Sequence, residues 1–365
     1  MRPRREELRG ELTTVHVLHA DSRAIVIVDA LRERGHEAFA TTDGALLKAG
    51  DLALVLGADS WGSTAAELFL RQAGDRGAIR VVWQIEPLLP PVTSLDAQNV
   101  VSKMLSGEWP AKDLVERRTH SLRDIIFCQR LAWACRGEPW VHPLFSGHVF
   151  KYPLQQTRCL MAYWHAGLID HCLVSLVPRL QFLERFDVPS RFVPFGYVPE
   201  FGRWLGEQPR DIDVLFLGRL SSRRRIQLRH LGKTLRAAGF NLKVVTRDCY
   251  GDERTRLLNR TKILLNIHKF PWEFPGMRLL MGMSCRTLVV SEPAPDTQPY
   301  QDGVHLVLSP AAELGETLIR YLQSPSQREE ITDRAYQFAT EEMALDTRLA
   351  RALSDLAPSS IGGVP

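Results

Sequence analysis

The chain lacks several features that would place it in a membrane or outside the cell. No apolar run in its 365 residues reaches the ~18–20 residues that a membrane-spanning helix needs. The first residues, MRPRREELRGE, are rich in arginine but contain no apolar segment of the kind found in secretory signals. We therefore expect a cytoplasmic protein. Peripheral membrane contact through this basic segment is an alternative, which the interleaved Glu6, Glu7 and Glu11 weaken.

Regular cysteine spacing and metal-binding motifs are also missing. The six cysteines form no C-x-x-C pair, and several lie in apolar surroundings, as reduced buried thiols do. His165 and His171 have no third ligand at zinc spacing. Asp211-Ile212-Asp213 resembles a metal-binding D-x-D motif, but we expect the pair to precede a strand, whereas a metal-bound diphosphate needs carboxylates at a strand's carboxyl end. We expect no metal site.

The charge of the chain has no strong sign. There are 46 lysines and arginines against 42 aspartates and glutamates, a formal net charge of +4, and this balance gives no reason to expect nucleic-acid binding. An apolar fraction of 45% and a charged fraction of 24% indicate a globular protein. Because 365 residues exceed what one hydrophobic core usually spans, two domains are expected.

The first half alternates apolar runs, which predict strands, with segments of 3.6-residue period, which predict helices. Gly35 is expected to end the first helix as a left-handed cap. Residues 136–153 contain three prolines and two glycines and predict an irregular loop. The expected strands are 14–20, 52–56, 79–85 and 173–176, and the expected helices are 22–34, 63–72, 122–134, 154–164 and 178–186.

The same alternation restarts after a Pro/Gly-containing stretch. We expect an N-terminal domain over residues 1–195, a hinge over 196–210, a second domain over 211–345, and a terminal helix with a flexible tail over 346–365. Such alternation implies right-handed βαβ units and a parallel sheet in each domain. The expected strands are 214–217, 242–245, 263–267, 287–290 and 305–308, and the expected helices are 222–238, 252–260, 311–322 and 327–342.

The most informative stretch of the chain is residues 262–292. It predicts a buried strand, a loop rich in Pro, Trp and Gly, a short helix and a second buried strand. In parallel sheets, ligands bind beyond the carboxyl ends of the strands. The polar residues expected to gather at such a ligand site are Asn266, His268, Glu273, Arg278, Ser291 and Glu292.

This stretch resembles the donor-binding half of GT-B glycosyltransferases, in particular the family 1-like, spore-maturation-type group. The features that carry the resemblance are Asn266-Ile267-His268, Glu273, Arg278 and Val289-Val290-Ser291-Glu292, with further matches at residues 83–88, 192–197 and 212–218. The resemblance implies an α/β fold of two Rossmann-like parallel-sheet domains that face each other across a cleft.

The resemblance also implies an activity. The chain would move a sugar from a nucleotide-sugar donor, expected to be a UDP- or GDP-sugar, to a small-molecule, saccharide or peptide acceptor, without a metal or other cofactor. Two alternatives stay open: a nucleotide-sugar epimerase on the same fold, and a catalytically degenerate GT-B binding protein. Inversion and retention at the anomeric carbon are both open.

Gly218, Arg219 and Arg223 occupy a point where a strand turns into a helix. A helix N-terminus presents free amides to a phosphate, and arginine adds bidentate donors. Arginine at this end of a helix opposes the helix dipole, so an anion would explain its presence. The alternative is a capped surface helix with solvated arginines.

The loop and short helix that follow carry further donor-site candidates. By resemblance, Glu273 would hydrogen-bond the sugar hydroxyls of the donor. Gly276 and the helix after it would offer amides to the diphosphate, and Arg278 would neutralise its charge. Alternatively, Arg278 only forms a salt bridge with Glu273. His268 would contact the donor from a strand end, or would be a satisfied structural residue.

One position departs from the pattern of the wider superfamily. Its retaining members carry Glu-x7-Glu, whose second Glu binds the nucleotide ribose, but Met281 occupies that position here. A thioether cannot accept hydrogen bonds from two ribose hydroxyls as a carboxylate can. Glu292 is the expected substitute. Otherwise Glu292 is an exposed turn residue, and the donor is unusual or activity is lost.

Candidates on the acceptor side are Glu86, expected at the end of a first-half strand, and His148, expected in the irregular loop. Either could act as a general base that takes a proton from an acceptor hydroxyl. Asp21, His142 and Lys151 belong to the same group. Each of the five has a structural role as its alternative.

Overall fold

The structure is a computed structural model. It describes residues 14–19, 22–58, 63–105, 122–138, 141, 147–274 and 276–356. The candidates Asp21 and His142 lie outside the described residues, as do the basic N-terminal segment and the expected flexible tail after residue 356.

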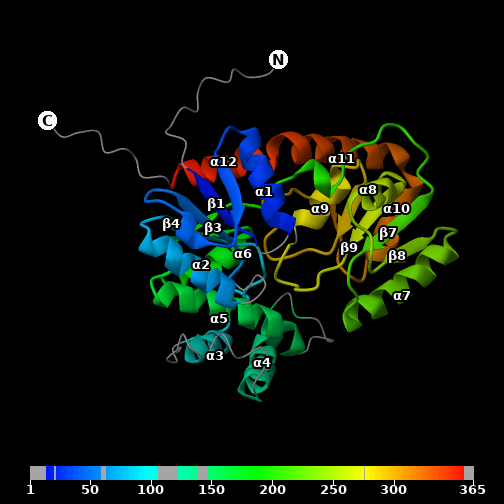
Figure 1. The fold of residues 1–365 in the computed structure, drawn as a ribbon. Coiled ribbons are helices and arrows are strands. Elements are labelled where there is room, and N and C mark those ends of the chain that lie inside the picture. The colour runs from blue at the N-terminus through cyan, green and yellow to red at the C-terminus, as the bar shows by residue number, and fades with distance from the viewer. Residues whose placement is uncertain are drawn as a thin grey trace. The chain divides into compact units, whose positions relative to one another are not determined.

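The chain divides into two compact units, each with its own sheet (Figure 1). Unit 1 comprises Met1–Glu138, Ser146–Val193 and Asp346–Pro365, and unit 2 comprises Pro139–Phe145 and Pro194–Leu345. The C-terminal segment that follows Leu345 therefore groups with the N-terminal half of the chain.

Unit 1 contains a parallel sheet with the strand order β2-β1-β3-β4-β5-β6. Its central strands are buried along their length, as their apolar runs predict. β2 is an edge strand with two exposed residues, and the sequence analysis missed it because it has no continuous apolar run. The strands are β1 (Val15–Leu18), β2 (Ala38–Thr41), β3 (Leu52–Leu56), β4 (Ile79–Gln84), β5 (His171–Val174) and β6 (Ser190–Phe192).

The helices of unit 1 follow the prediction with one correction. Gly35 has a φ of +85°, which confirms the expected left-handed cap. The expected loop through Pro153 is wrong at its end, because α5 already begins at Lys151. Proline is tolerated in the first turn of a helix, where its missing N–H leaves no intrahelical bond unmade. The helices are α1 (Ser22–Glu33), α2 (Ser63–Asp75), α3 (Leu95–Leu105), α4 (Leu122–Ala134), α5 (Lys151–His165), α6 (Val177–Glu184) and α12 (Leu345–Ser354), with 3₁₀ turns η1 (Gly44–Leu46), η3 (Cys135–Gly137) and η4 (Gly147–Phe150).

Unit 2 contains a parallel sheet with the strand order β11-β10-β9-β7-β8. Alternate residues of its central strands pack into two apolar clusters, with Leu215 and Leu264 in one and Phe216 and Leu265 in the other. This is the side-chain alternation of a strand that is covered on both faces. The strands are β7 (Ile212–Leu217), β8 (Leu242–Val245), β9 (Thr261–Asn266), β10 (Leu288–Ser291) and β11 (Val307–Leu308).

The helices of unit 2 connect these strands. The expected helix over residues 327–342 consists of α11 and a π-helical turn. The helices are α7 (Ser222–Ala237), α8 (Gly251–Asn259), α9 (Gly276–Met283), α10 (Leu314–Gln323) and α11 (Pro325–Gln337), with the 3₁₀ turn η5 (Pro199–Phe201) and the π turn η6 (Phe338–Glu342). The prediction of an α/β fold with two parallel sheets is confirmed. None of the described helices is both long and apolar enough to cross a membrane.

The D-x-D pair lies at the amino end of β7, but Asp213 is inside the strand and not before it, as expected from sequence. Its buried carboxylate accepts hydrogen bonds from the backbone N–H and the Nδ2 of Asn241, and from Nζ of Lys262 at 2.7 Å. Asp211 is exposed and pairs with Arg260. Asp213 therefore links three segments of unit 2.

The two segments where the chain passes between the units lie against each other within unit 2. The Tyr197 N–H donates to the Met343 carbonyl at 2.6 Å, and the Leu345 N–H donates to the Tyr197 carbonyl at 2.9 Å. A Cβ on Gly196 would lie 2.4 Å from Cα of Leu345, so this approach requires glycine. The expected hinge over residues 196–210 stays a prediction.

Candidate functional site

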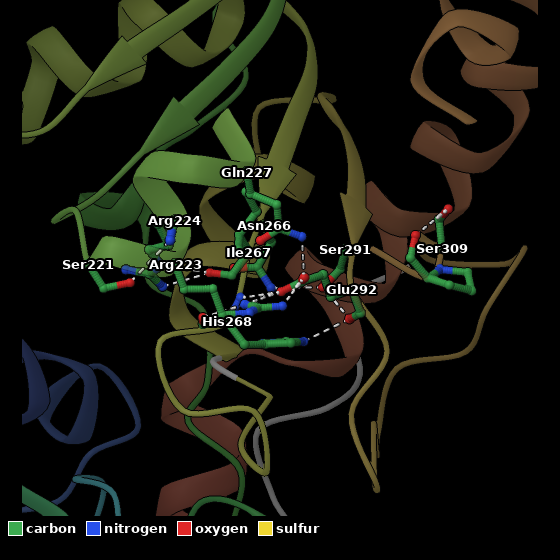
Figure 2. Close-up of polar contacts among 11 residues, drawn as sticks. Ser221, Arg223, Arg224, Gln227, Asn266, Ile267, His268, Ser291, Glu292 and Ser309 are labelled. Carbon is green, nitrogen blue, oxygen red and sulfur yellow. Dashed lines mark hydrogen bonds and ion pairs between the residues drawn. The ribbon is translucent and has the colours of Figure 1, made fainter. Parts of the chain in front are cut away.

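Polar residues gather at the carboxyl ends of three strands of unit 2, beside the N-terminus of α7 (Figure 2). Asn266 ends β9 and Ser291 ends β10, and the two residues are neighbours in the strand register. Nδ2 of Asn266 donates to Oγ of Ser291 at 2.8 Å. His268 and Glu292 follow directly after these strands. The structure thus brings these four predicted residues together.

The carboxylate of Glu292 is only 3% exposed and is surrounded by donors. It accepts hydrogen bonds from both terminal nitrogens of Arg223, from Nε2 of Gln227 at 2.7 Å and from the backbone N–H of His268 at 2.9 Å. Burial by itself would raise the pKa of Glu292, but the hydrogen bonds and charge of Arg223 outweigh it and lower the pKa. A carboxylate has about four acceptor positions, and four donors already occupy them.

His268 is buried beside this carboxylate. Its Nε2 lies 2.7 Å from the backbone oxygen of Glu292, and a carbonyl can only accept, so Nε2 carries the proton. Burial lowers the pKa of His268 to about 4, which makes the ring neutral at pH 7. Its Nδ1 is then an acceptor, and it has no hydrogen-bond partner among the described residues. Nδ1 is available to a hydroxyl or amide of a ligand.

Arg224 and Arg278 place two guanidinium groups near the ring of Phe216, at 5.6 and 5.9 Å from its centroid. Nε and Nη2 of Arg224 donate to the carbonyl of Ile267 at 3.0 and 2.7 Å. Nη1 of Arg278 donates to Oδ1 of Asn266 at 2.8 Å. Within the described part of the chain, neither arginine forms an ion pair with a carboxylate.

This pair of arginines is electrostatically unbalanced. Burial, together with the charge of Arg278, lowers the pKa of Arg224 to about 9, and burial lowers the pKa of Arg278 to about 10. Removing a cation from water without a counter-ion is unfavourable, and a bound anion would offset this effect. The arrangement is suited to an anionic ligand.

Gly218 and the first turn of α7 complete this region. Gly218 has a φ of +146°, and a Cβ there would lie 2.7 Å from Nη2 of Arg278. Ser221 is the N-cap of α7, and its hydroxyl accepts a hydrogen bond from the N–H of Arg224 at 3.3 Å. The side chain of Arg219 is exposed, and its carbonyl accepts from Nη1 of Arg224 at 2.8 Å. Glycine and a helix N-terminus therefore meet the two arginines at one edge of the sheet.

The loop before α9 holds Glu273 in apolar surroundings. Glu273 is 6% exposed between the buried side chains of Trp272 and Phe274, and its N–H donates to the carbonyl of Phe270 at 3.0 Å. The alternative of a salt bridge with Arg278 is not observed between these two described residues. A buried carboxylate near this edge could accept hydrogen bonds from hydroxyl groups.

Gly276 begins α9, and its carbonyl accepts a hydrogen bond from the hydroxyl of Tyr300 at 3.4 Å. A Cβ at this position would lie 2.9 Å from the same hydroxyl. Met281, at the position of the ribose-binding Glu, is partly buried and packs against the apolar cluster that includes Phe274 and Tyr300. Its side chain belongs to the core of unit 2.

The acceptor-side candidates lie in unit 1 and do not contact each other by any hydrogen bond within the described structure. Glu86 follows β4 and is half-buried, and it accepts hydrogen bonds from Nη1 of Arg23 and from the hydroxyl of Tyr152, both at 2.8 Å. His148 is exposed on η4. Lys151 begins α5 instead of lying in a loop.

Sequence reasoning missed two residues of the unit 2 cluster. Gln227 lies four residues after Arg223, which places both side chains on one face of α7, and this spacing was the available signal. Arg224 is buried, although the sequence shows it only as one of a run of arginines. No periodic pattern distinguishes it from its exposed neighbour Arg225.

Comparison with known proteins adds to this geometry. Residues 210–354, less than half of the chain, match the sequence profile of the family described as "Glycosyl transferase-like". A comparison with curated protein sequences returned no match.

Solved structures with similar folds cover most of the chain at low identity. Sucrose-phosphate synthase from Thermosynechococcus elongatus is 10% identical with a TM-score of 0.55, and the match covers 94% of this chain and 99% of that one. Anabaena HepE in complex with UDP-glucose is 10% identical with a TM-score of 0.51 and the same coverage. The pneumococcal O-GlcNAc transferase GtfA, in complex with UDP and GlcNAc, is 10% identical with a TM-score of 0.49 over 86% of this chain, which spans 58% of GtfA.

The structural matches show the fold, and the sequence profile shows which part of the chain carries a family signature. The chain has the α/β, two-sheet fold of GT-B glycosyltransferases, and its residues 210–354, which contain the site described above, match the glycosyl transferase-like family.

Proposed function

We propose that the protein is a glycosyltransferase that binds a nucleotide-sugar donor, a UDP- or GDP-sugar, on unit 2. The observation that carries this proposal is the pair Arg224 and Arg278, two buried guanidinium groups without a carboxylate partner among the described residues. They lie beside a glycine and a helix N-terminus, where phosphate groups bind in parallel α/β sheets. HepE, which has the same fold, was solved with UDP-glucose.

In the proposed reaction, the bond between the anomeric carbon of the sugar and the diphosphate oxygen breaks, and a bond from the acceptor oxygen to the same carbon forms. The diphosphate leaves with the bonding electron pair. Arg224, Arg278 and the amides after Gly276 would stabilise the negative charge that develops on it. We assign no metal or other cofactor to this step.

The rest of the donor would contact neighbouring side chains. Glu273 is the proposed acceptor of hydrogen bonds from the sugar hydroxyls, since it is a buried carboxylate beside the same edge. Because four donors already engage Glu292, its main proposed role is to orient Arg223 and His268. The free Nδ1 of His268 is the better placed group for a ribose hydroxyl.

The acceptor would bind to unit 1, with Glu86 as the proposed general base. Arg23 and Tyr152 hold this carboxylate in a fixed position, as a base requires. The proton of the acceptor hydroxyl would pass to Glu86 as the new bond forms. His148 is the second candidate, but its exposed side chain has no such fixed position. The acceptor would be a small molecule, a saccharide or a peptide.

We propose a cytoplasmic setting for this reaction. The six cysteines are all free and buried, as is usual in a reducing compartment. Burial raises the pKa of Cys135, Cys172 and Cys285 to about 12, so these thiols are unreactive.

Calorimetric titration with UDP, GDP, ADP, CMP and dTDP tests the donor site. We expect one diphosphate to bind with micromolar affinity, and Arg278→Ala to weaken this binding by about tenfold or more, because charge-assisted hydrogen bonds to phosphate are lost. Arg320→Ala, an exposed arginine on α10 of the same unit, is the matched control and should leave binding unchanged. No binding of any diphosphate at millimolar concentration would contradict the proposal.

A second function class is a GT-B domain that binds a ligand or partner without catalysis. The packing of Met281 into the apolar core, in place of a ribose-binding carboxylate, favours it. Product analysis separates the possibilities. Transfer needs both a donor and an acceptor, an epimerase would change the donor without an acceptor, and a binding domain would change neither.

A further inference from the structure

The segment from residue 214 to residue 247 is strongly basic. It contains nine arginines and lysines and no aspartate or glutamate, although the whole chain has nearly equal numbers of both signs. Arg223 pairs with Glu292, and Arg224 is buried. The remaining seven side chains are exposed, and within the described part of the chain they form no ion pair: Arg219, Arg225, Arg229, Lys233, Arg236, Lys243 and Arg247.

Part of this segment encloses a groove. α7 lies along β8 at one end of the second sheet (Figure 1), and the two elements border an open groove with a volume of about 740 Å³. Ile226 and Val244 are 50% and 40% exposed, so the groove has apolar side chains next to its charges. The residues of α7 that line it recur at spacings of three or four and so share one helix face: Ile226, Arg229, Lys233 and Arg236.

The other wall of the groove is an unpaired sheet edge. β8 is the last strand of its sheet and pairs only with β7. The Val214 N–H donates to the Asn241 carbonyl and the Gly218 N–H to the Val245 carbonyl. Because peptide groups alternate in direction along a strand, those of Leu242 and Val244 point away from β7, toward the groove. This edge can form main-chain hydrogen bonds with another extended chain.

We propose that this groove binds an extended, acidic polypeptide segment, which adds to the edge of β8 as a further strand. The peptide groups of Leu242 and Val244 would supply main-chain hydrogen bonds. Carboxylates of the segment would pair with Arg229, Lys233 and Arg236, while its alternate apolar side chains would cover Ile226. The binding surface does not include the residues of the proposed donor site, so it is independent of the proposed function.

Edge protection and non-peptide polyanions account for fewer of these features. Charged residues often protect sheet edges from aggregation, but protection does not require a concave, partly apolar groove or seven exposed cations without an acidic neighbour. A nucleic acid or an anionic membrane would match the charge. Neither offers main-chain donors and acceptors to the edge of β8, and a membrane surface is flat. The combination of edge, groove and charge therefore favours a polypeptide.

Fluorescence anisotropy of the full chain with a labelled peptide of alternating glutamate and valine tests this proposal. We expect binding that salt weakens, and a loss of about tenfold or more in affinity for the double variant Arg229→Glu/Lys233→Glu. The matched control is Lys48→Glu/Arg76→Glu, two exposed residues of unit 1, which should bind the peptide as the unchanged protein does. Diphosphate binding should be the same in all three proteins.

A second peptide of the same sequence and charge, N-methylated at alternate residues, tests the strand pairing directly, since it cannot donate main-chain hydrogen bonds along one edge. We expect its affinity to fall by about tenfold or more. Equal binding of both peptides would reduce the effect to charge attraction and overturn the proposal. Tighter binding of a single-stranded oligonucleotide or of vesicles containing phosphatidylserine would also overturn it, in favour of another partner.

Discussion

The guanidinium group of Arg278 lies directly against Gly218, so that a Cβ on residue 218 would be 2.7 Å from Nη2 of Arg278. The backbone of Gly218 also has a φ of +146°, which side chains disfavour. This contact fixes the position of an arginine that carries the proposed phosphate site. Glycine is thus required at this position for two separate reasons.

We expect Gly218→Ala to lower the free energy of unfolding by about 1–3 kcal/mol because of backbone strain, and to weaken diphosphate binding because Arg278 must move. Urea unfolding and calorimetry measure the two effects. Gly239→Ala is the matched control, since Gly239 has a φ of +83° and a Cβ added there would meet no atom within 4 Å. It should lose stability without losing binding. Equal binding losses in both variants would contradict a local effect on Arg278.

The Glu292 carboxylate should matter more for stability than any exposed acid. Glu292→Gln would leave Arg223 and the His268 N–H facing an amide in a buried site, and we expect a loss of about 2–4 kcal/mol in unfolding free energy. Asp211→Asn removes an exposed ion pair with Arg260 and should have little effect. Urea denaturation of both variants checks this. Similar midpoints for the two would mean that the buried network is not cooperative.

The unfolding free energy should decrease as the pH falls below about 6.5. In the folded protein, burial lowers the pKa of His268 to about 4, whereas the unfolded chain takes up the proton near pH 6.5. The unfolded state therefore binds more protons between these values, and the loss should reach about 1.4 kcal/mol per pH unit for this residue. Above pH 7 both states are neutral and this contribution is constant.

Comparison of His268→Gln with the unchanged protein isolates this effect, because the amide nitrogen of glutamine can replace Nε2–H. The pH slope of stability between pH 6.5 and about 4.5 should become shallower. Burial also lowers the pKa values of His16, His36 and His305, so a residual slope is expected. Below about pH 4.5, loss of the Glu292 pairing, whose pKa is lowered, continues the decrease. An unchanged slope in the variant would exclude His268 as a source.

Glu86 should affect turnover more than stability. If it is the general base, Glu86→Gln should reduce kcat by about 10²–10⁴-fold while diphosphate binding on unit 2 stays constant. His148→Gln, which changes an exposed side chain, should reduce kcat far less. Steady-state kinetics with the donor identified by calorimetry provides the measurement. A larger effect of His148→Gln would exchange the two assignments.

Most of the local structure could be predicted from sequence because it depends on nearest neighbours. Apolar runs and turn formers located β3, β8 and α4, and Gly35 marked the end of α1. β2 was not found because an edge strand, with half of its residues exposed, has no apolar run. The start of α5 was missed because Pro153 suggested a break, although proline is compatible with a first turn.

The sequence by itself determined the two-sheet α/β architecture and the strand ends where the polar residues of unit 2 would gather, because burial on both faces and the parallel crossover are written in local patterns. Only the tertiary structure decided how these residues are paired. Glu292, expected to bind a ribose, is engaged by Arg223, Gln227 and His268, while Arg278, expected to pair with Glu273, contacts Asn266 instead. Such pairings depend on distances between segments that lie far apart along the chain, which no local pattern encodes.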